Sequence, residues 1–230
     1  MKTLGLIGGM SWFSTAVYYK TINQLTNDRL GGANSAKLIL YSVNFNDYKE
    51  LQDKHNWKQI ENMFSAIANK LDNAGADCIV MCTNTPHLVA DKIRQKIKIP
   101  LIHIAEETAK EIVKQKISKV ALLGTKFTME NSFFKDKLSA LGIESIIPDS
   151  GDRNIIHTSI FNEFTKGIYK KETKKKYLDI IEKMRKDGAQ GVIFGCTEIS
   201  LLLNPSECSV SVFDTTAIHS KAAVDFAMST

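Results

Sequence analysis

Residues 80–87 read VMCTNTPH, in which an apolar run stops at a cysteine and a threonine and is followed by polar residues without hydrophobic spacing. Cys82 carries a thiol and Thr83 a hydroxyl, and both groups can give a proton to a substrate or, once deprotonated, take one. A second apolar run stops in the same way at Cys196, in FGCTEI. The two stretches indicate acid–base chemistry, and the first leaves open whether Cys82 or Thr83 is the reactive group.

An internal repeat relates the two stretches to each other. GADCIVMCTN, which begins at Gly75, aligns without a gap on GAQGVIFGCT, which begins at Gly188. The alignment places Thr83 on Cys196 and puts Cys82 on a glycine. We therefore expect Thr83 and Cys196 to occupy equivalent positions, which suits a reaction that removes a proton from one face of a carbon and returns one to the other.

The repeat extends along the chain and predicts the fold. GLIGG (5–9) resembles ALLGT (121–125), and PLIH (100–103) resembles SVFD (211–214). Short apolar runs alternate with amphipathic stretches such as 58–73, which favours parallel strands joined by helices. We predict an α/β fold of two pseudo-symmetric halves, each a mostly parallel sheet flanked by helices, with the active site in the cleft between them. The apolar runs are 4–8, 37–43, 78–81, 100–104, 119–124, 191–195 and 210–214.

The predicted halves are residues 1–108 and 109–230, with the option that the C-terminal helix packs back onto the first half. Ligands of open parallel sheets bind beyond the carboxyl ends of the strands. VMCTNTPH and FGCTEI both stand at such ends, so we expect them to carry the site.

The composition argues against several classes of protein. The 230 residues have a formal net charge of +5 and four cysteines, too few for a disulfide scaffold, and they contain no CxxC motif of a zinc site. No stretch approaches the ~18 apolar residues of a membrane-spanning helix, and the first apolar run is too short for a signal peptide. The lysine-dense segment 166–177 has helical spacing and no nucleic-acid motif. We expect a cytoplasmic protein without metal, nucleic acid or membrane partner.

The two equivalent residues differ in the chemistry they can do. A cysteine near a helix N-terminus has a lowered pKa and can serve as a base, whereas a threonine hydroxyl is a poor base but an adequate proton donor. Cys196 is therefore the predicted general base and Thr83 the acid on the opposite face. Because side chains alternate along a strand, Cys82 is the predicted buried neighbour. The polar residues nearby either line the substrate loops or cap helices, and His87 either orients its loop or caps a helix; these polar residues are Ser11, Asn84, Thr85 and Thr197.

Three motifs, GLIGGM, CTNTPH and FGCTEI, resemble those of the aspartate/glutamate racemase family, in the family's order and over essentially the whole chain. The resemblance implies an amino-acid racemase that needs no cofactor, pyridoxal phosphate included, and that often forms a homodimer. The family's usual catalytic pair is two cysteines, the first in a Cys-Asn-Thr motif. Here Thr83 precedes Asn84 and Thr85, which is similar to a branch of the family with threonine at this place.

The resemblance also implies a substrate, L-aspartate or L-glutamate, because the family's second-half cysteine acts on the L-enantiomer. A dicarboxylic amino acid needs two anion sites, and Lys166 belongs to one of them. Aspartate-specialised members commonly carry an arginine after the second strand, whereas residues 44–58 contain none and Gln52 is the best substitute. The expected substrate-binding residues are Met10, Gln52, Asn84, Thr85, Lys166 and Thr197.

Other functions remain open at this point. Hydantoin racemases, maleate isomerases and malonate decarboxylases share the superfamily's general appearance, and a substrate panel separates them. A nucleotide or small-anion binding protein is the non-enzymatic alternative. GLIGGM lacks the GxGxxG spacing of a dinucleotide site, and no suitable acidic residue follows ~20 positions on.

Overall fold

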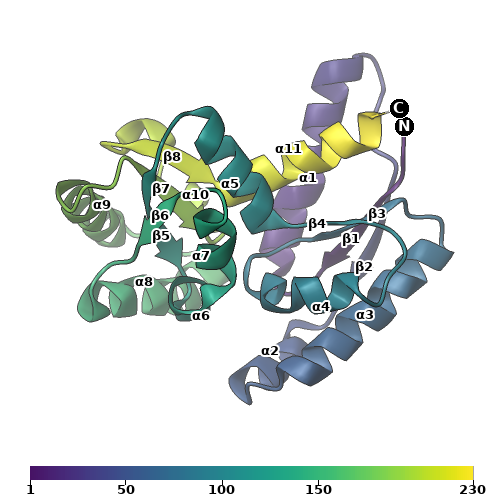
Figure 1. The fold of residues 1–230 in the computed structure, drawn as a ribbon, viewed down its shortest axis with the longest axis horizontal. Coiled ribbons are helices and arrows are strands. Elements are labelled where there is room, and N and C mark those ends of the chain that lie inside the picture. The colour runs from purple at the N-terminus through teal and green to yellow at the C-terminus, as the bar shows by residue number, and fades with distance from the viewer. Residues whose placement is uncertain (230) are drawn as a thin grey trace. The chain divides into compact units, whose positions relative to one another are not determined.

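The computed structural model describes residues 1–229, and their contacts divide the chain into two compact units. The first unit comprises residues 1–104 and the segment from His219 onward, and the second comprises residues 105–218. Both are parallel sheets flanked by helices, so the predicted α/β class is confirmed (Figure 1). No helix within the described residues is both long and apolar enough to cross a bilayer.

The first unit has a four-stranded sheet in the order β2-β1-β3-β4, with every pairing parallel. Its elements are β1 (Leu4–Gly8), α1 (Trp12–Leu30), β2 (Leu38–Ser42), α2 (Phe45–Asp53), α3 (Trp57–Asn73), β3 (Cys78–Met81), the 3-10 turn η1 (Thr85–Val89), α4 (Ala90–Arg94), β4 (Leu101–Ile102) and most of α11 (Thr215–Met228).

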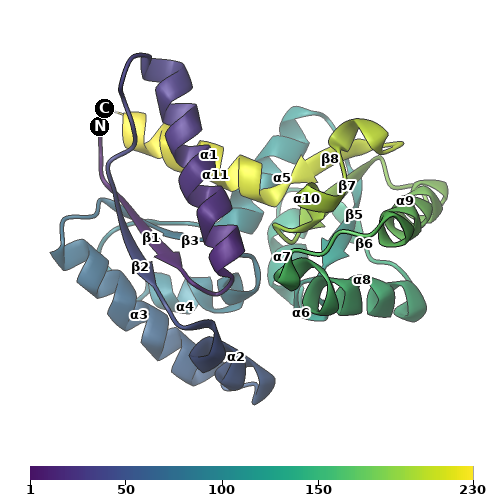
Figure 2. The same cartoon turned by 180° about the vertical axis from the view of Figure 1, so that it is seen from behind.

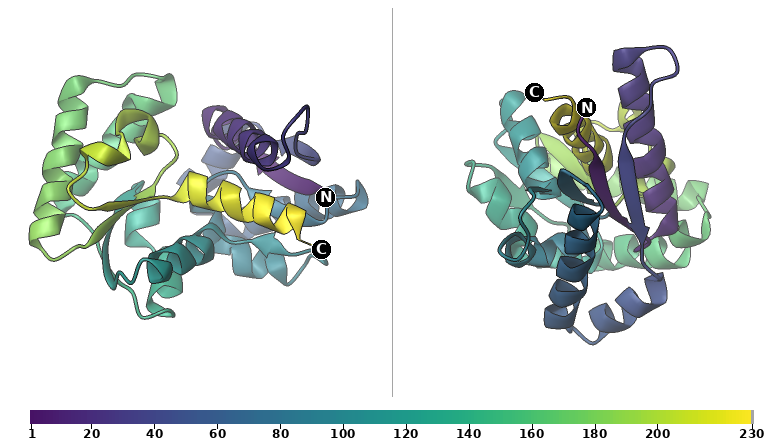
Figure 3. Two further views of the ribbon diagram at one scale, coloured as in Figure 1. Left: turned by 90° about the horizontal axis from the view of Figure 1, so that it is seen from above. Right: turned by 90° about the vertical axis from the view of Figure 1, so that its right-hand side faces the viewer.

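Alternation along the strands divides the core of this unit into two layers. Leu4 and Leu6 of β1 belong to a cluster with α1 and α11, whereas Ile7 belongs to a cluster with α2, α3 and α4. The cluster on the α1 and α11 face also contains Tyr18, Ile22, Cys78, Val80, Cys82, Ala223, Val224 and Ala227. The two ends of the chain lie side by side in this layer, where the Lys2 amide donates to the Ala227 carbonyl at 2.8 Å (Figure 3).

Helix α3 shows how the sequence builds these layers. Its apolar residues recur at helical spacing, and the buried ones are Ile60, Phe64, Ile67, Ala68 and Leu71. The Asn56 side chain caps its first turn by accepting from the Gln59 amide. The chain leaves the helix through Gly75, whose φ of 94° favours glycine, and enters β3 directly.

The second unit repeats the same topology, with a four-stranded parallel sheet in the order β6-β5-β7-β8. Helices α8 and α9 cover one face, and α5 and α7 lie on the other (Figures 1 and 2). The elements are α5 (Ile104–Lys114), β5 (Lys119–Gly124), α6 (Lys126–Glu130), α7 (Ser132–Ser139), β6 (Glu144–Ile146), α8 (Ser150–Asn162), η2 (Phe164–Lys166), α9 (Lys171–Lys186), β7 (Gly191–Gly195), α10 (Ile199–Leu202), η3 (Pro205–Glu207) and β8 (Ser211–Asp214).

Candidate active site

Strand register makes Thr83 and Cys196 equivalent within their own units. The β3 residue two positions before Thr83 pairs with Ile7 of β1. The β7 residue two positions before Cys196 pairs with Leu123 of β5. The alignment of GLIGG on ALLGT places Ile7 on Leu123, so the pairing in the two sheets reproduces the register of the sequence repeat.

Cys82 lies in the core and is separated from the loop that follows. It is 1% exposed, packs in the cluster on the α1 and α11 face, and its amide donates to the Ile7 carbonyl at 2.9 Å. Burial raises the pKa of its thiol. Thr83, one residue further on, is partly exposed. The prediction that Cys82 is a buried neighbour is therefore confirmed, and an inert neutral thiol is its expected state.

The backbone around Thr83 is held by hydrogen bonds from three elements. Its amide donates to the Met81 carbonyl at 2.9 Å. Ser14 Oγ of α1 donates to the Cys82 carbonyl at 2.6 Å, and His87 Nδ1 of η1 lies 2.9 Å from the Thr83 carbonyl. These bonds fix the main chain on both sides of the threonine.

The loop between β1 and α1 lies against the end of β2 because of Gly9. Its φ is 89°, and a Cβ at this position would come 2.1 Å from the Val43 carbonyl oxygen. The Gly9 amide donates to Thr15 Oγ1 at 2.9 Å. Ser11, for which a loop role and a cap were both open, is the N-cap of α1, and its hydroxyl accepts from the Ser14 amide at 3.3 Å.

The second unit places a carboxylate against the predicted base. Cys196 Sγ donates to Glu198 Oε2 at 3.0 Å, and Thr197 Oγ1 donates to the same oxygen at 2.6 Å. Glu198 is itself buried, with 3% of its surface exposed. Sequence reasoning missed Glu198, although an acidic residue two positions after the cysteine was a visible signal.

The lowered pKa expected for Cys196 is wrong. Burial and the Glu198 carboxylate raise the pKa of this partly exposed thiol well above its usual value, although the Thr197 and Glu198 amides face the sulfur and oppose the rise. Helix α10 begins at Ile199 and has four residues, so its dipole offers little stabilisation to a thiolate. The raised pKa favours the neutral thiol as the resting form of Cys196.

The segment that carries Lys166 runs close to Cys196. Tyr169 stacks on Phe164 with ring centroids 5.6 Å apart, and its pKa is raised by burial first and then by Glu198 and Cys196. Lys166 ends η2 and is exposed. The segment therefore places the Tyr169 ring near the thiol–carboxylate pair.

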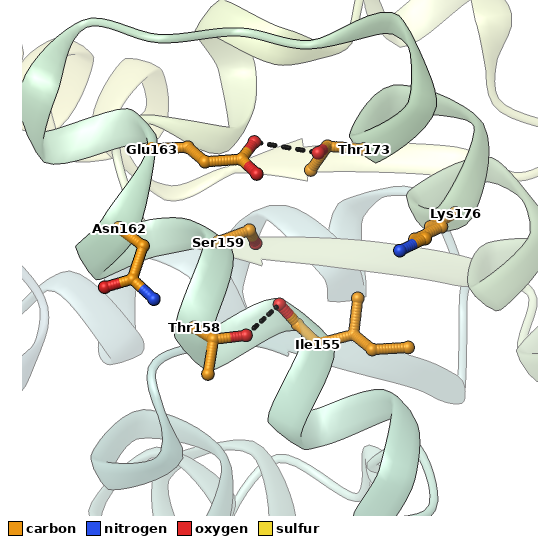
Figure 4. Close-up of a pocket in the computed structure, with 7 residues that line it drawn as sticks. All are labelled: Ile155, Thr158, Ser159, Asn162, Glu163, Thr173 and Lys176. Atoms are coloured by element: carbon orange, nitrogen blue, oxygen red, sulfur yellow. Dashed lines mark hydrogen bonds between the residues drawn. The ribbon is translucent and has the colours of Figure 1, made fainter.

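A small pocket of about 140 Å³ lies between α8 and α9, next to this segment (Figure 4). Glu163 accepts from Thr173 Oγ1 at 2.7 Å and pairs with Lys170 at 3.2 Å, so its carboxylate is satisfied. The Glu163 carbonyl accepts from the Lys166 amide at 2.9 Å. The pocket is lined by Ile155, Thr158, Ser159, Asn162, Glu163, Thr173 and Lys176. We interpret this pocket as a structural feature next to the turn that carries Lys166.

Four of the other predicted binding residues fall at or near the carboxyl ends of strands, and Gln52 does not. Asn84 and Thr85 follow β3 and are buried, and Thr197 follows β7 and is buried. The Met10 side chain packs in the cluster on the α3 face and is buried. Gln52 is 6% exposed in α2, away from the strand ends in sequence.

The described residues contain no group of three or more histidine, cysteine or acidic side chains arranged to hold a metal ion. The sequence model of the Asp/Glu/hydantoin racemase family matches residues 7–223. The chain belongs to this family.

Individual relatives extend the match over the whole chain. A solved structure of a candidate Asp/Glu racemase from Yersinia pestis is 49% identical, with a TM-score of 0.94 and 100% of both chains covered. An aspartate racemase homologue from Pyrococcus horikoshii is 33% identical, with a TM-score of 0.89 and the same coverage. The broad-specificity amino-acid racemase RacX of Bacillus subtilis is 24% identical over 96% of both chains. This amino-acid racemase membership confirms the resemblance found in the motifs.

Proposed function

We propose that the protein is a cofactor-independent racemase that acts on L-aspartate or L-glutamate through Cys196 and Thr83. The observation that carries the proposal is the bond from Cys196 Sγ to Glu198 Oε2 at 3.0 Å, at the strand end equivalent to the one that carries Thr83. A racemase needs one proton-active group for each face of Cα. The proposal requires both residues to reach one substrate.

The protons taken up and released in the proposed reaction balance, and no electron acceptor is needed. Glu198 accepts the Cys196 proton, and the thiolate takes the α-proton of the L-enantiomer. The Thr83 hydroxyl then gives a proton to the opposite face and is reprotonated from solvent, to which Glu198 releases the proton it accepted. The Thr197 and Glu198 amides supply the fixed N–H dipoles that the anionic species at the sulfur needs.

Substrate carboxylates need donors, and the proposed set is drawn from both units. Lys166 offers an exposed ammonium group in the same segment as Tyr169, which suits a carboxylate partner. Thr197 is less free for a ligand, because its hydroxyl is already bonded to Glu198. The proposed substrate-binding residues remain Met10 through its backbone, Gln52, Asn84, Thr85, Lys166 and Thr197.

Broad specificity is the second candidate. Residues 44–58 contain no arginine for a side-chain carboxylate, and the RacX relative has broad specificity. The two candidates differ in whether a neutral amino acid exchanges its α-proton as fast as aspartate. We also propose a homodimer located in the cytoplasm, which light scattering and fractionation test.

The decisive experiment is incubation in D2O with L-aspartate, L-glutamate and a neutral amino acid, with the α-proton followed by NMR and the configuration by polarimetry. We expect exchange with at least one substrate, its loss in Cys196→Ala with the fold intact, and its retention after dialysis against EDTA. An inactive, folded Cys82→Ala protein would contradict the choice of Thr83.

A further inference from the structure

His87 holds the carbonyl groups of the residues that precede η1. Its ring is 1% exposed, and Nδ1 lies 2.9 Å from the Thr83 carbonyl oxygen and 3.2 Å from that of Asn84. A carbonyl oxygen only accepts hydrogen bonds, so Nδ1 must carry the hydrogen and donate it. Within the described residues, Nε2 is buried without a hydrogen-bond partner. The ring is therefore a neutral imidazole with one fixed tautomer.

The ring of His87 is itself held by packing. Its centroid lies 4.9 Å from that of His103 and 5.4 Å from that of His219, both at edge-to-face angles. His219 is fixed in turn, because Tyr18 Oη lies 2.8 Å from its Nδ1 and the Ile102 carbonyl lies 2.9 Å from its Nε2. The ring of His87 thus has a single orientation, set by His103, which directly follows β4, and by His219 of α11.

We propose that His87 is a positioning residue for Thr83, fixing the point from which the threonine hydroxyl serves the second face of Cα. This inference rests on the proposed function. The Cys82 carbonyl is bonded to Ser14 and the Thr83 amide to Met81, so the His87 bond completes the set that holds the Thr83 main chain. Loss of the Nδ1–H donor removes the hydrogen bond to the Thr83 carbonyl. The Thr83 main chain then shifts, and its hydroxyl is displaced.

The test separates the two faces of the reaction. Exchange of the L-substrate α-proton requires Cys196 alone, whereas inversion also requires Thr83. A displacement of about 1 Å at a reacting group costs roughly 10²-fold in rate, so we expect inversion in His87→Leu to fall about 10²-fold. Exchange should fall much less, and the ratio of exchange to inversion should rise at least about tenfold.

Conservative variants make the test specific to one nitrogen. The Asn side-chain amide in His87→Asn can donate from near the Nδ1 position, and we expect it to restore the wild-type ratio. His87→Gln places its amide near the Nε2 position and should behave like His87→Leu, which covers the case in which leucine does not fold. The matched control is His157→Leu in α8, which removes the hydrogen bond from the Lys126 amide to His157 Nδ1 and should lower Tm without changing the ratio.

Each possible outcome either supports or contradicts the positioning role of His87. A raised ratio in His87→Leu or His87→Gln that asparagine reverses supports the positioning role. An unchanged ratio in folded variants, or an equal rise in His157→Leu, shows that His87 is structural only, while the racemase proposal stands. A wild-type protein that exchanges no substrate overturns the proposed function and the positioning role together.

Discussion

Replacement of Glu198 by glutamine should make Cys196 more reactive and the enzyme less active. Glutamine keeps an acceptor oxygen for Cys196 Sγ and Thr197 Oγ1 but removes the negative charge. The charge has two opposite effects in the proposed mechanism. It disfavours the thiolate at rest, and it accepts the thiol proton during turnover.

The effect of the Glu198 charge on the stability of the Cys196 thiolate follows from the 3.0 Å separation of Cys196 Sγ and Glu198 Oε2. Two unit charges at that distance repel by about 5 kcal/mol at an effective dielectric constant of about 20. Cys196 is partly exposed, and solvent screening reduces this to about 2 kcal/mol. A difference of that size corresponds to a roughly 30-fold larger thiolate population in Glu198→Gln at neutral pH.

The assay is alkylation by iodoacetamide at pH 7, resolved by peptide mass spectrometry, alongside racemisation of the preferred substrate. Cys208 is a second partly exposed thiol and serves as the internal reference in each sample. We expect the Cys196 to Cys208 rate ratio to rise about 30-fold and turnover to fall about 10²-fold, the usual contribution of a general base. Glu172→Gln, on the exposed start of α9, is the control for charge removal elsewhere. Unchanged alkylation, or turnover that rises together with alkylation, would refute the role given to Glu198.

Three further predictions follow from the geometry. Cys82→Ala should lose about 1 kcal/mol of stability, because it removes one buried atom, and should keep most racemisation; large loss of activity in the folded variant contradicts it. Gly9→Ala should lower the free energy of unfolding by more than about 2 kcal/mol, because its Cβ would clash with the Val43 carbonyl, and urea unfolding with a smaller loss would refute it. Burial lowers the pKa of His219 to about 4. The unfolded ring takes up a proton near pH 6.5, so stability should be complete above that pH and fall by up to about 3 kcal/mol as the pH drops toward 4; a flat stability profile over this range contradicts it.

Most of the fold could be predicted because seven of the strands are short apolar runs. Strand β6 was missed, since Glu144–Ile146 is an edge strand with an exposed first residue and two partly buried ones. It pairs through its backbone with Lys119–Ala121, and backbone pairing leaves no apolar pattern in a three-residue strand. The sequence also left open where the last helix packs, because local periodicity does not say which sheet its apolar face covers.

The site was less predictable than the fold. The repeat identified Thr83 and Cys196 as equivalent, since their register depends only on positions along two strands. The direction of the Cys196 pKa depends on where the Glu198 carboxylate points, and spacing alone does not give that. The bond from His87 to the Thr83 carbonyl was one of two open alternatives for the same reason.

The return of α11 to the first unit has a consequence for biosynthesis. Ala223, Val224 and Ala227 fill the layer that also contains Leu4 and Leu6. The ribosome delivers β1 to β4 early, yet one face of their sheet is covered by α1 alone until α11 has been made up to residue 228. The second unit, residues 105–218, has all of its strands before that moment. The part synthesised first should therefore be the part completed last, and a nascent chain stalled before α11 should expose apolar surface to chaperones.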